Sequence, residues 1–474
     1  MEPMMTTNFN LYDIVLNGDA EEMEQARYVV LEGWVKTNRD NGSIGFIEFN
    51  DGTYFKNVQL VYTKDCKDYE VASKFKTGSA IKVVGEVKLT PENKQPFEVE
   101  IKECELEGDV EEDYPLQKKR HSFEFLREIA HIRPRANTFQ AVYRVRSVLA
   151  FAIHEFFQQR GFIYVHTPLI TGSDCEWAGE MFQVTTLDLE HPDLKWKDGK
   201  IDYTKDFFGK HASLTVSGQL NGETFATAFG KIYTFGPTFR AENSNTTRHA
   251  SEFWMIEPEI SFADITDNMD LTEDLLKYVF QYILDNAPQE IEFFTKFINP
   301  EVKDRLEKFT KADFGRVTYT EAVEILEKAD AEKHFEFKPH RGMDMQTEHE
   351  RYLAEEYFKG PVFVIDYPKE IKAFYMKLNE DWKTVAAMDL LAPWIWEIVW
   401  WSQREDRLDV LTQKIIDNGM KPEDYRRYLD LRKWGSVPHS GFWVGFERLV
   451  MYVTGMENIR DVLPFPRTPK NCDF

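Results

Sequence analysis

The sequence has few cysteines and no long apolar segment. Cys66, Cys104, Cys175 and Cys472 are the only cysteines among 474 residues, and their spacing does not match a metal-binding knuckle. Scattered thiols of this kind are most simply reduced, as in a cytoplasmic protein. No run of about 18 uninterrupted apolar residues occurs, so we expect no membrane-spanning helix.

We also expect no secretion signal, and the chain has no excess of positive charge. Its first residues, MEPMMTTNFN, do not place basic residues before an apolar stretch. The 58 lysines and arginines against 81 aspartates and glutamates give a net charge of −23. This balance argues against indiscriminate binding of nucleic acid. A local basic surface would still be enough for one RNA partner.

Residues 28–110 contain five short runs with the alternation of strands. Gly, Asn and Asp separate the runs, and Asp51-Gly52 is a strong turn signal. Five strands in about 80 residues predict a small Greek-key barrel of the OB type. A chain of 474 residues has room for a second, larger domain. The five runs are YVVLEGWVKT, IGFIEFND, VQLVYT, AIKVVGEVKL and FEVEIKECEL.

Aromatic residues of this barrel have two possible uses. Phe46 and Phe49, with Lys36 and Arg39 nearby, are suited to stacking on bases and contacting phosphates of single-stranded RNA. The alternative is that the rings fill the barrel core, and the residues alone favour this for at least one of them.

The rest of the chain begins with a long helical pattern. From Asn137 to Arg160 apolar residues recur at helical spacing, and Gly161 follows in the C-cap position. The next residues, GFIYVHTPLI, predict a strand that carries Pro168. The helix is amphipathic and needs a partner surface, either its own core or another subunit.

Further along, helices are expected first and strands afterwards. Residues 263–358 are helix-rich, and Thr318 and Glu321 form a predicted capping box. Strands are predicted in the stretches PVFVIDYP, KAFYMKL and TVAAMDLLAP, which cover 361–368, 372–378 and 384–393.

The stretch 231–262, KIYTFGPTFRAENSNTTRHASEFWMIEPEISF, predicts two strands joined by a long polar loop. Arg240 and Glu242 lie two residues apart and face a loop that carries Arg248 and His249. The Arg offers a planar, permanently charged fork to phosphate oxygens, and the Glu can hold an amine. A solvated hairpin with ordinary surface charge is the alternative.

This stretch is long enough to compare with known families. FRAE, followed by TxRHxxEFWMIEPE, resembles motif 2 of the class II aminoacyl-tRNA synthetases in the form of the bacterial asparaginyl enzymes. HSGFWVGFERLVMYVTG at 439–455 resembles motif 3, and the helix and strand from Asn137 resemble motif 1. GWVKTNRD with GFIEF and VQLVY resembles the anticodon-binding barrel of aspartyl and asparaginyl enzymes. The resemblance covers essentially the whole chain.

The resemblance implies an α+β chain with defined domains. An N-terminal OB-fold anticodon-binding domain would cover 1–112 and a hinge 113–135. A class II catalytic domain, an antiparallel sheet flanked by helices, would cover 136–474, with a helical insertion without chemistry at about 263–358. The implied reaction is ATP- and Mg²⁺-dependent activation of asparagine, followed by transfer to tRNA(Asn). Family members form homodimers through the motif 1 helix and strand.

The resemblance also assigns roles to individual residues. Arg240, Glu242 and Arg448 would be catalytic, with Arg240 on the α-phosphate and Arg448 on the distal phosphates. The remaining positions would bind ATP (His249, Phe253, Glu397), Mg²⁺ (Asp389, Glu397), the amino acid (Glu176, Ser217, Gln219, Arg404) and tRNA (Arg39, Phe46, Gln59). The carboxylate that accepts from the asparagine amide stays open among Glu223, Glu242 and Glu252.

One position separates asparagine from aspartate as the substrate. Aspartyl enzymes carry a Lys three residues after the position of Gln219, and this chain has Gly222. Without that cation the site suits an uncharged amide. Three alternatives remain: an aspartyl-type ligase, an amide-forming enzyme on the same catalytic core, which would not need the barrel, and a non-catalytic tRNA-binding variant.

Seven tryptophans depart from the family pattern, because the asparaginyl enzymes ordinarily have glycine there. Large side chains inserted into packed sites cost about 1–3 kcal/mol each, and more where the backbone has a positive φ. We hypothesise a variant with a sterically blocked active site; core packing of one or two indoles and a base-stacking cage are the alternatives. The seven are Trp177, Trp382, Trp394, Trp396, Trp400, Trp401 and Trp443.

Overall fold

The computed structural model describes residues 3–172, 180–190, 196–197, 200–244 and 246–473, without the side chains of residues 196, 197, 396, 397 and 401. The contacts divide the chain into two compact units, Met1–Ala141 and Val142–Phe474. Each unit is described by itself. No helix within the described ranges is long and apolar enough to cross a membrane.

The N-terminal unit is built on a closed five-stranded barrel. Strand pairing runs β2–β3–β4–β6–β5 and returns from β5 to β2, so the five predicted strands and the OB fold are confirmed. The short β1 (Met4–Met5) pairs in parallel with β2. The barrel strands are β2 (Tyr28–Asp40), β3 (Ile44–Asn50), β4 (Val58–Thr63), β5 (Ala80–Leu89) and β6 (Phe97–Gly108), and the helices of this unit are α1 (Asn8–Asn17), α2 (Ala20–Gln25), α3 (Tyr69–Ala72) and α4 (Phe123–Glu128).

The two phenylalanines of β3 lie on opposite faces of the strand, one toward the barrel core and one toward the outside. Phe49 is fully buried with Tyr62 and Phe97 in the barrel core, so the core alternative, expected for at least one of the two rings, holds for Phe49. Phe46 lies between Gly45 and Ile47, which are both buried, and is itself only partly buried. Residues alternate between the two faces of a strand, and β3 therefore offers Phe46 to the outside.

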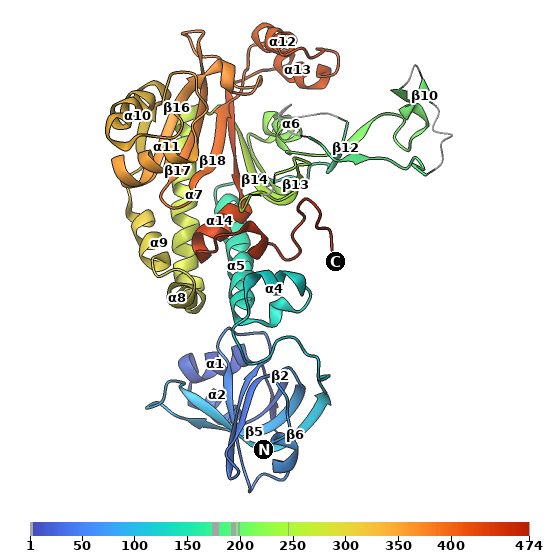
Figure 1. The fold of residues 1–474 in the computed structure, drawn as a ribbon, viewed down its shortest axis with the longest axis vertical. Coiled ribbons are helices and arrows are strands. Elements are labelled where there is room, and N and C mark those ends of the chain that lie inside the picture. The colour runs from blue at the N-terminus through green and yellow to red at the C-terminus, as the bar shows by residue number, and fades with distance from the viewer. Residues whose placement is uncertain (1–2, 173–179, 191–195, 198–199, 245, 474) are drawn as a thin grey trace. The chain divides into compact units, whose positions relative to one another are not determined.

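The second unit contains an eight-stranded mixed sheet in the order β15-β16-β17-β18-β19-β14-β13-β7. Figure 1 shows α10 and α11 beside β16, near one edge of this sheet, and β13 near the other. The strands are β7 (Ile163–Tyr164), β13 (Lys231–Phe239), β14 (Glu252–Ser261), β15 (Gly315–Thr318), β16 (Val362–Pro368), β17 (Thr384–Ala392), β18 (Trp396–Gln403) and β19 (His439–Gly445).

Helices and two small sheets surround the main sheet. α14 packs against β14 and β19, and α6 packs against β13 and β14. The small sheets pair β8 (Ile170–Thr171) and β9 (Gln183–Val184) with β12 (Ala212–Leu214), and β10 (Trp196–Lys197) with β11 (Lys200–Ile201). The helices are α5 (Asn137–Gln159), α6 (Gln219–Phe229), α7 (Ile265–Asn286), α8 (Pro288–Phe297), α9 (Val302–Lys311), α10 (Tyr319–Lys333), α11 (Thr347–Arg351), α12 (Leu408–Asp417), α13 (Arg426–Lys433) and α14 (Phe446–Thr454).

Most predicted elements are present at the predicted places. The helix from Asn137, both strands of the 231–262 hairpin and the Thr318–Glu321 capping box are confirmed. The region 263–358 is helix-rich as expected, but its strand β15 pairs in parallel with β16 and belongs to the main sheet.

The strand predicted at 372–378 is wrong. This stretch forms only single bridges, at Met376 and Leu378. Its neighbouring aromatic residues Phe374 and Tyr375 are both buried, whereas a half-buried strand would bury alternate residues only. Packing of both rings into the core therefore overrides the local strand propensity.

Gly455 at the end of α14 provides a test of this packing. Its φ is +72°, and an added Cβ would lie 2.7 Å from Val302 Cγ2 and 2.9 Å from Asn299 Cβ. Gly455→Ala combines left-handed strain with overlap, and we expect it to lower the free energy of unfolding by about 2–4 kcal/mol. Gly419 has the same conformation, φ +73°, but no atom within 4 Å of its added Cβ, so Gly419→Ala should cost only about 1 kcal/mol. Denaturant titration of both variants makes the comparison, and equal losses would contradict the packing argument.

Candidate active site

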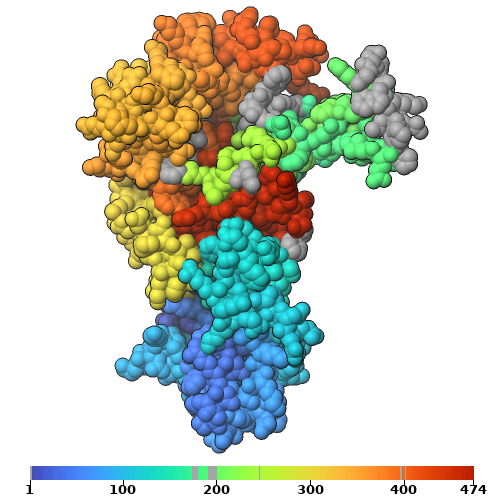
Figure 2. Space-filling view, in the orientation of Figure 1, coloured from blue at the N-terminus to red at the C-terminus, as the bar shows by residue number. Residues whose placement is uncertain are grey.

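Four of the five residues predicted to bind ATP, all but Glu397, line one cavity of about 680 Å³ together with Glu242, a volume typical of ligand sites. Arg240 and Glu242 follow β13, Phe253 lies on β14, His249 lies in the loop between them, and Arg448 lies in the first turn of α14. In Figure 2 the yellow-green atoms of the β13–β14 region lie beside the red atoms of the C-terminal region. The structure thus brings together five predicted residues from two distant parts of the sequence.

Backbone pairing and one buried carboxylate hold these residues in place. The Arg240 amide donates to the carbonyl of Ser251 at 2.9 Å, which closes the start of the hairpin loop. The buried Glu447 accepts from the Trp254 amide at 2.9 Å and from Arg146 at 2.7 Å. Because Glu447 fixes the first turn of α14 to β14, the neighbouring Arg448 is presented from a rigid helix start.

Three guanidinium groups gather where the loop meets α14, those of Arg240, Arg248 and Arg448. Burial and the nearby Arg448 lower the pKa of His249, as do Arg240 and Arg248, against an opposing effect of Glu242. Burial and Arg448 also lower the pKa of Arg248. Guanidinium groups placed together in this way are suited to binding phosphate oxygens.

The opposite wall of the cavity was missed by the sequence reasoning. Asp344 and Glu350 line it, although both lie in the region expected to have no chemistry. Burial and repulsion from Asp389 raise the pKa of Glu350 to about 7, with Arg448 and Arg248 acting in the opposite direction. Nothing in the charge-rich string EHERYLAEEYF distinguishes Glu350 from its neighbours.

The predicted magnesium ligands are only partly described. Asp389 on β17 is buried, and its carboxylate accepts from Lys372 Nζ at 2.7 Å. The side chain of Glu397 lies outside the described residues. Among the side chains that are described, no group of three or more His, Cys, Asp or Glu is placed to hold a metal ion.

The predicted amino-acid ligands Ser217 and Gln219 lie where the chain enters α6. The Ser217 hydroxyl donates to Glu257 of β14. The same carboxylate accepts from the Gly218 amide at 3.0 Å and from the Thr234 hydroxyl at 2.9 Å. Gln219 Nε2 donates to Glu223 at 3.1 Å, one turn further along the helix.

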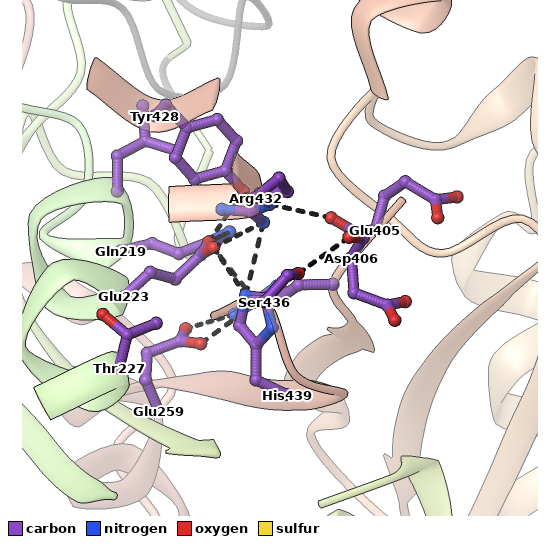
Figure 3. Close-up of polar contacts among 12 residues, drawn as sticks. Gln219, Glu223, Thr227, Glu259, Glu405, Asp406, Tyr428, Arg432, Ser436 and His439 are labelled. Atoms are coloured by element: carbon purple, nitrogen blue, oxygen red, sulfur yellow. Dashed lines mark hydrogen bonds and ion pairs between the residues drawn. The ribbon is translucent and has the colours of Figure 1, made fainter. Parts of the chain in front are cut away.

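Glu223 is the centre of a buried polar network (Figure 3). It accepts from Arg432 at 2.8 Å and from the Tyr428 hydroxyl at 2.9 Å, and His439 Nε2 lies 3.0 Å away. Burial acts to raise the pKa of Glu223, but Arg432, His439 and Arg404 together hold it well below the ordinary value. Glu223 therefore stays ionised and keeps its acceptor character.

The predicted ligand Arg404 is fully buried beside this network and binds Glu259 with two nitrogens. Burial raises the pKa of Glu259 to about 7, against Arg404 and with a contribution from Glu223. Of the other two carboxylates considered for the asparagine amide, Glu242 lines the 680 Å³ cavity and Glu252 a separate one at the C-terminal segment. Arg432, His439, Tyr428 and Glu259 were not predicted, because only the fold brings them to Glu223.

Four of the seven tryptophans have described side chains, and these lie in three places. Trp400 and Trp443 line the 680 Å³ cavity. Trp394 lines a neighbouring cavity of about 940 Å³, and Trp382 is 57% exposed in a turn that lines neither cavity, so the expectation that it blocks substrates is wrong. Trp382 and Trp394 have φ of +58° and +78°, the region that favours glycine. Glu176, Trp177 and the side chains of Trp396 and Trp401 lie outside the described residues.

The residues predicted to bind tRNA share the outer face of the barrel. Arg39 on β2 pairs directly with Phe46 on β3, and Gln59 on β4 pairs with Glu48, two residues along from Phe46. Paired residues lie on the same face of a sheet. Gln59 Nε2 donates to Glu98 at 2.9 Å, which orients its amide on this face.

Comparisons with known proteins agree with both units. The family described as tRNA synthetases class II (D, K and N) matches residues 123–469, and the OB-fold nucleic acid binding domain matches residues 29–107. The asparagine–tRNA ligase of Clostridium botulinum (strain Alaska E43 / Type E3) is 61% identical over 449 residues, which cover 95% of this chain and 96% of that protein. The asparagine–tRNA ligase of Alkaliphilus oremlandii is 60% identical, with 94% and 96% covered.

Solved structures show the same likeness. The asparaginyl-tRNA synthetase from Pyrococcus horikoshii complexed with asparaginyl-adenylate has a TM-score of 0.81 and 34% identity, and the match covers 94% of this chain and 96% of that chain. The Entamoeba histolytica asparaginyl-tRNA synthetase in complex with asparaginyl-adenylate has a TM-score of 0.78 and 25% identity, with 94% and 96% covered.

The raised pKa of Glu350 predicts how stability depends on pH. Folding raises this pKa from 4.5 to about 7, so between these values the folded chain keeps a proton that the unfolded chain has lost. The free energy of unfolding therefore falls as the pH rises from about 4.5 to about 7. Glu350→Gln has no such loss, and at pH 8 we expect it to be roughly 1–3 kcal/mol more stable than the parent.

Denaturant titration at pH 5 and pH 8 measures the free energy of unfolding of the parent and of Glu350→Gln. Glu327→Gln, at an exposed position on α10, is the matched control and should follow the parent at both pH values. A Glu350→Gln variant that also follows the parent would show that repulsion at this wall is negligible.

Proposed function

The chain belongs to the class II tRNA synthetases of the D, K and N family, within it to the asparagine–tRNA ligases, and from this premise we propose how its residues perform the reaction. Such a ligase uses ATP to activate asparagine and then transfers it to tRNA. The assignment of sites depends mainly on two groups of residues along β14. Phe253 of this strand lines the cavity with Arg240 and Arg448, and Glu259, further along the same strand, binds Arg404 beside Glu223 of α6.

In the first step the asparagine carboxylate attacks the α-phosphorus of ATP. A bond forms between a carboxylate oxygen and phosphorus, the bond to the β-phosphate breaks, and pyrophosphate leaves. Arg240 offers two parallel N–H groups to the α-phosphate, Arg448 neutralises the distal phosphates, and Phe253 stacks on the adenine. Catalysis of this kind consists mainly of positioning and charge neutralisation.

In the second step the terminal ribose hydroxyl of tRNA attacks the activated carbonyl carbon. The ester bond to the ribose forms, and AMP leaves with the electron pair of the broken bond. Glu242 lies in the cavity beside Arg240, where it can hold the ammonium group of asparagine through both steps. A second ammonium ligand from Glu176 remains a prediction.

The buried network supplies selection for the side-chain amide. Glu223 is ionised and accepts the amide N–H, and Arg404 donates to the amide oxygen. Gly222 supports asparagine over aspartate, because an added Cβ there would lie 3.6 Å from Glu259 Cγ, and a lysine on it would bring a cation into this pocket. Without that cation, an aspartate carboxylate would face Glu223 and Glu259 at a cost typical of buried like charges.

We expect Mg²⁺ to bind together with ATP, with Asp389 and Glu397 as its protein ligands. Asp389 and Glu350 repel each other, so a cation bound between these carboxylates would stabilise both. Lys372 provides a positive charge to Asp389 in this structure. Oxygen-rich sites of this type suit Mg²⁺. When bound, the ion would supply positive charge to the phosphate oxygens.

A homodimer would cover apolar side chains that this single chain exposes. Phe151 of α5 and Ile163 and Tyr164 of β7 are exposed, and they belong to the helix and strand that resemble motif 1. Exposed apolar groups on contiguous elements are typical of subunit interfaces. We expect the dimer to act in the cytoplasm.

Asparagine-dependent exchange of pyrophosphate into ATP tests the proposed function. On a folded, dimeric sample we expect exchange with asparagine at least about 100-fold faster than with aspartate, because a site built for an uncharged amide rejects the charged analogue. Equal exchange with both amino acids, or faster exchange with aspartate, would contradict the assignment. A folded, dimeric sample that exchanges with neither amino acid would contradict the proposed activity and leave only a role in binding tRNA.

The outer face of the barrel is tested through tRNA. Phe46→Ala removes a stacking ring, and we expect the KM for tRNA(Asn) to rise about 10-fold, since stacking on a base is worth about 1–3 kcal/mol. Exchange of pyrophosphate, which needs no tRNA, should not change. Trp34→Ala, at another exposed aromatic position of the barrel, controls for loss of surface aromatic area. An unchanged KM for Phe46→Ala would rule out this face of the barrel as the tRNA-binding surface.

A further inference from the structure

The buried network around Glu223 holds two carboxylates close to one guanidinium group. Glu223 of α6 and Glu259 of β14 are both almost completely buried. Arg404 binds Glu259 through two nitrogens, and its Nε lies 3.9 Å from Glu223. Two like charges in one buried site repel each other, which favours protonation of one of them. Because one guanidinium compensates one carboxylate, the other carboxylate needs a second cation to stay ionised.

Arg432 supplies a second permanent charge from α13. Its Nη2 donates to Glu223 at 2.8 Å, and its Nε donates to the carbonyl of Glu405 at 2.9 Å, just after β18. The guanidinium lies 4.0 Å from the ring centroid of Tyr428, whose hydroxyl also donates to Glu223. Figure 3 shows Arg432 pointing toward Glu223 and His439. A guanidinium stays charged at any working pH, whereas a histidine is charged only when protonated.

The two carboxylates respond differently to the cations around them. Burial acts to raise the pKa of Glu223, and the charge of Arg432 opposes this effect. Together with His439 and Arg404, it holds this pKa well below the ordinary value. Burial raises the pKa of Glu259 to about 7 in spite of Arg404, and the charge of Glu223 contributes to the rise. Glu223 is therefore the ionised acceptor of the two, and its charge depends on α13.

Arg432 also keeps an unused donor beside this acceptor. Its Nη1 is buried and has no hydrogen-bond partner among the described residues. Buried polar groups in native proteins are nearly always satisfied by protein, water or a bound molecule. A primary amide needs an acceptor for its N–H and a donor for its oxygen. Glu223 and Arg432 offer this combination side by side.

We propose that Arg432 determines the choice between asparagine and aspartate. It keeps Glu223 ionised, so the site accepts an amide N–H and repels a carboxylate. In the absence of Arg432, Glu223 would take up a proton, and the neutral group could donate to an aspartate carboxylate. The proposal rests on the proposed function for the identity of the substrate, and it adds α13 to the elements that select the amino acid.

Isothermal titration calorimetry with the sulfamoyl analogues of asparaginyl- and aspartyl-adenylate measures the selection without turnover. We expect the parent chain to bind the asparaginyl analogue at least about 100-fold more tightly than the aspartyl one. Arg432→Met removes the charge, and loss of a charge-assisted hydrogen bond should weaken binding of the asparaginyl analogue about 10- to 150-fold. The aspartyl analogue is relieved of repulsion by Glu223 and should change by less than about threefold. The preference for the asparaginyl analogue therefore falls at least about 10-fold.

Three further variants separate the charge from damage to the fold. Arg432→Gln removes the charge but keeps a donor toward Glu223, so either folded neutral variant gives the answer. Arg432→Lys keeps the charge and should retain the rejection of the aspartyl analogue. Arg426→Met, on the same helix with a side chain that is 81% exposed, is the matched control and should leave both dissociation constants unchanged. Circular dichroism shows which variants are folded.

A preference in the folded neutral variants that stays within about threefold of the parent would overturn the proposal. An equal loss of affinity for MgATP, whose cavity of about 680 Å³ does not include Arg432, would also overturn it, because the change would then not be one of selection. A parent chain that binds both analogues equally would instead contradict the asparagine assignment, and with it the selection given to Arg432. The first two results leave the proposed function standing, so the two failures are distinguishable.

Discussion

The ion pair between Glu259 and Arg404 passes over β19, and the rest of the site depends on it. Glu259 lies on β14 and Arg404 directly follows β18, while β19 runs between these two strands. Both groups are almost completely buried, and a buried charge that lost its partner would cost about 3–5 kcal/mol. β19 can therefore carry no side chain beneath the ion pair, because a Cβ on Gly441 would lie 2.2 Å from the Glu259 carboxylate.

The same constraint explains how one sheet face supports two kinds of chemistry. At Gly441, β19 has no side chain, and carboxylates and guanidinium groups can occupy the space above it in a fixed arrangement without water. Recognition of an amide requires such an arrangement. Toward Arg448 the face opens into a cavity of about 680 Å³, whose arginines face open space that a ligand can occupy. Arg432 and His439 complete the closed end, and because they also bind Glu223, the two ends differ in rigidity as well as in charge.

Sequence reasoning predicted what depends on local pattern and missed what depends on the fold. The barrel strands alternate cleanly and were confirmed, and motifs 2 and 3 drew attention to Arg240 and Arg448, which line the same cavity. Glu350, Arg432 and His439 carry no local signal, because each acquires its role from a partner more than a hundred residues away or on another strand. The stretch 372–378 was misassigned for the complementary reason, since burial of Phe374 and Tyr375 decides its conformation, and the same factor settles the open choice for Phe49.

The row beside Gly441 combines packing within the sheet with access for a ligand. Trp400 and Trp443 stack with ring centroids 4.3 Å apart, and such a pair contributes roughly 0.5–1.5 kcal/mol beyond the apolar area that it buries. The guanidinium groups of Arg448 and Arg240 lie over these rings, which adds cation–π attraction. The indoles line the cavity of about 680 Å³ and leave its volume open, so the contacts that hold this wall together also hold the two arginines at the edge of the space that a nucleotide would occupy.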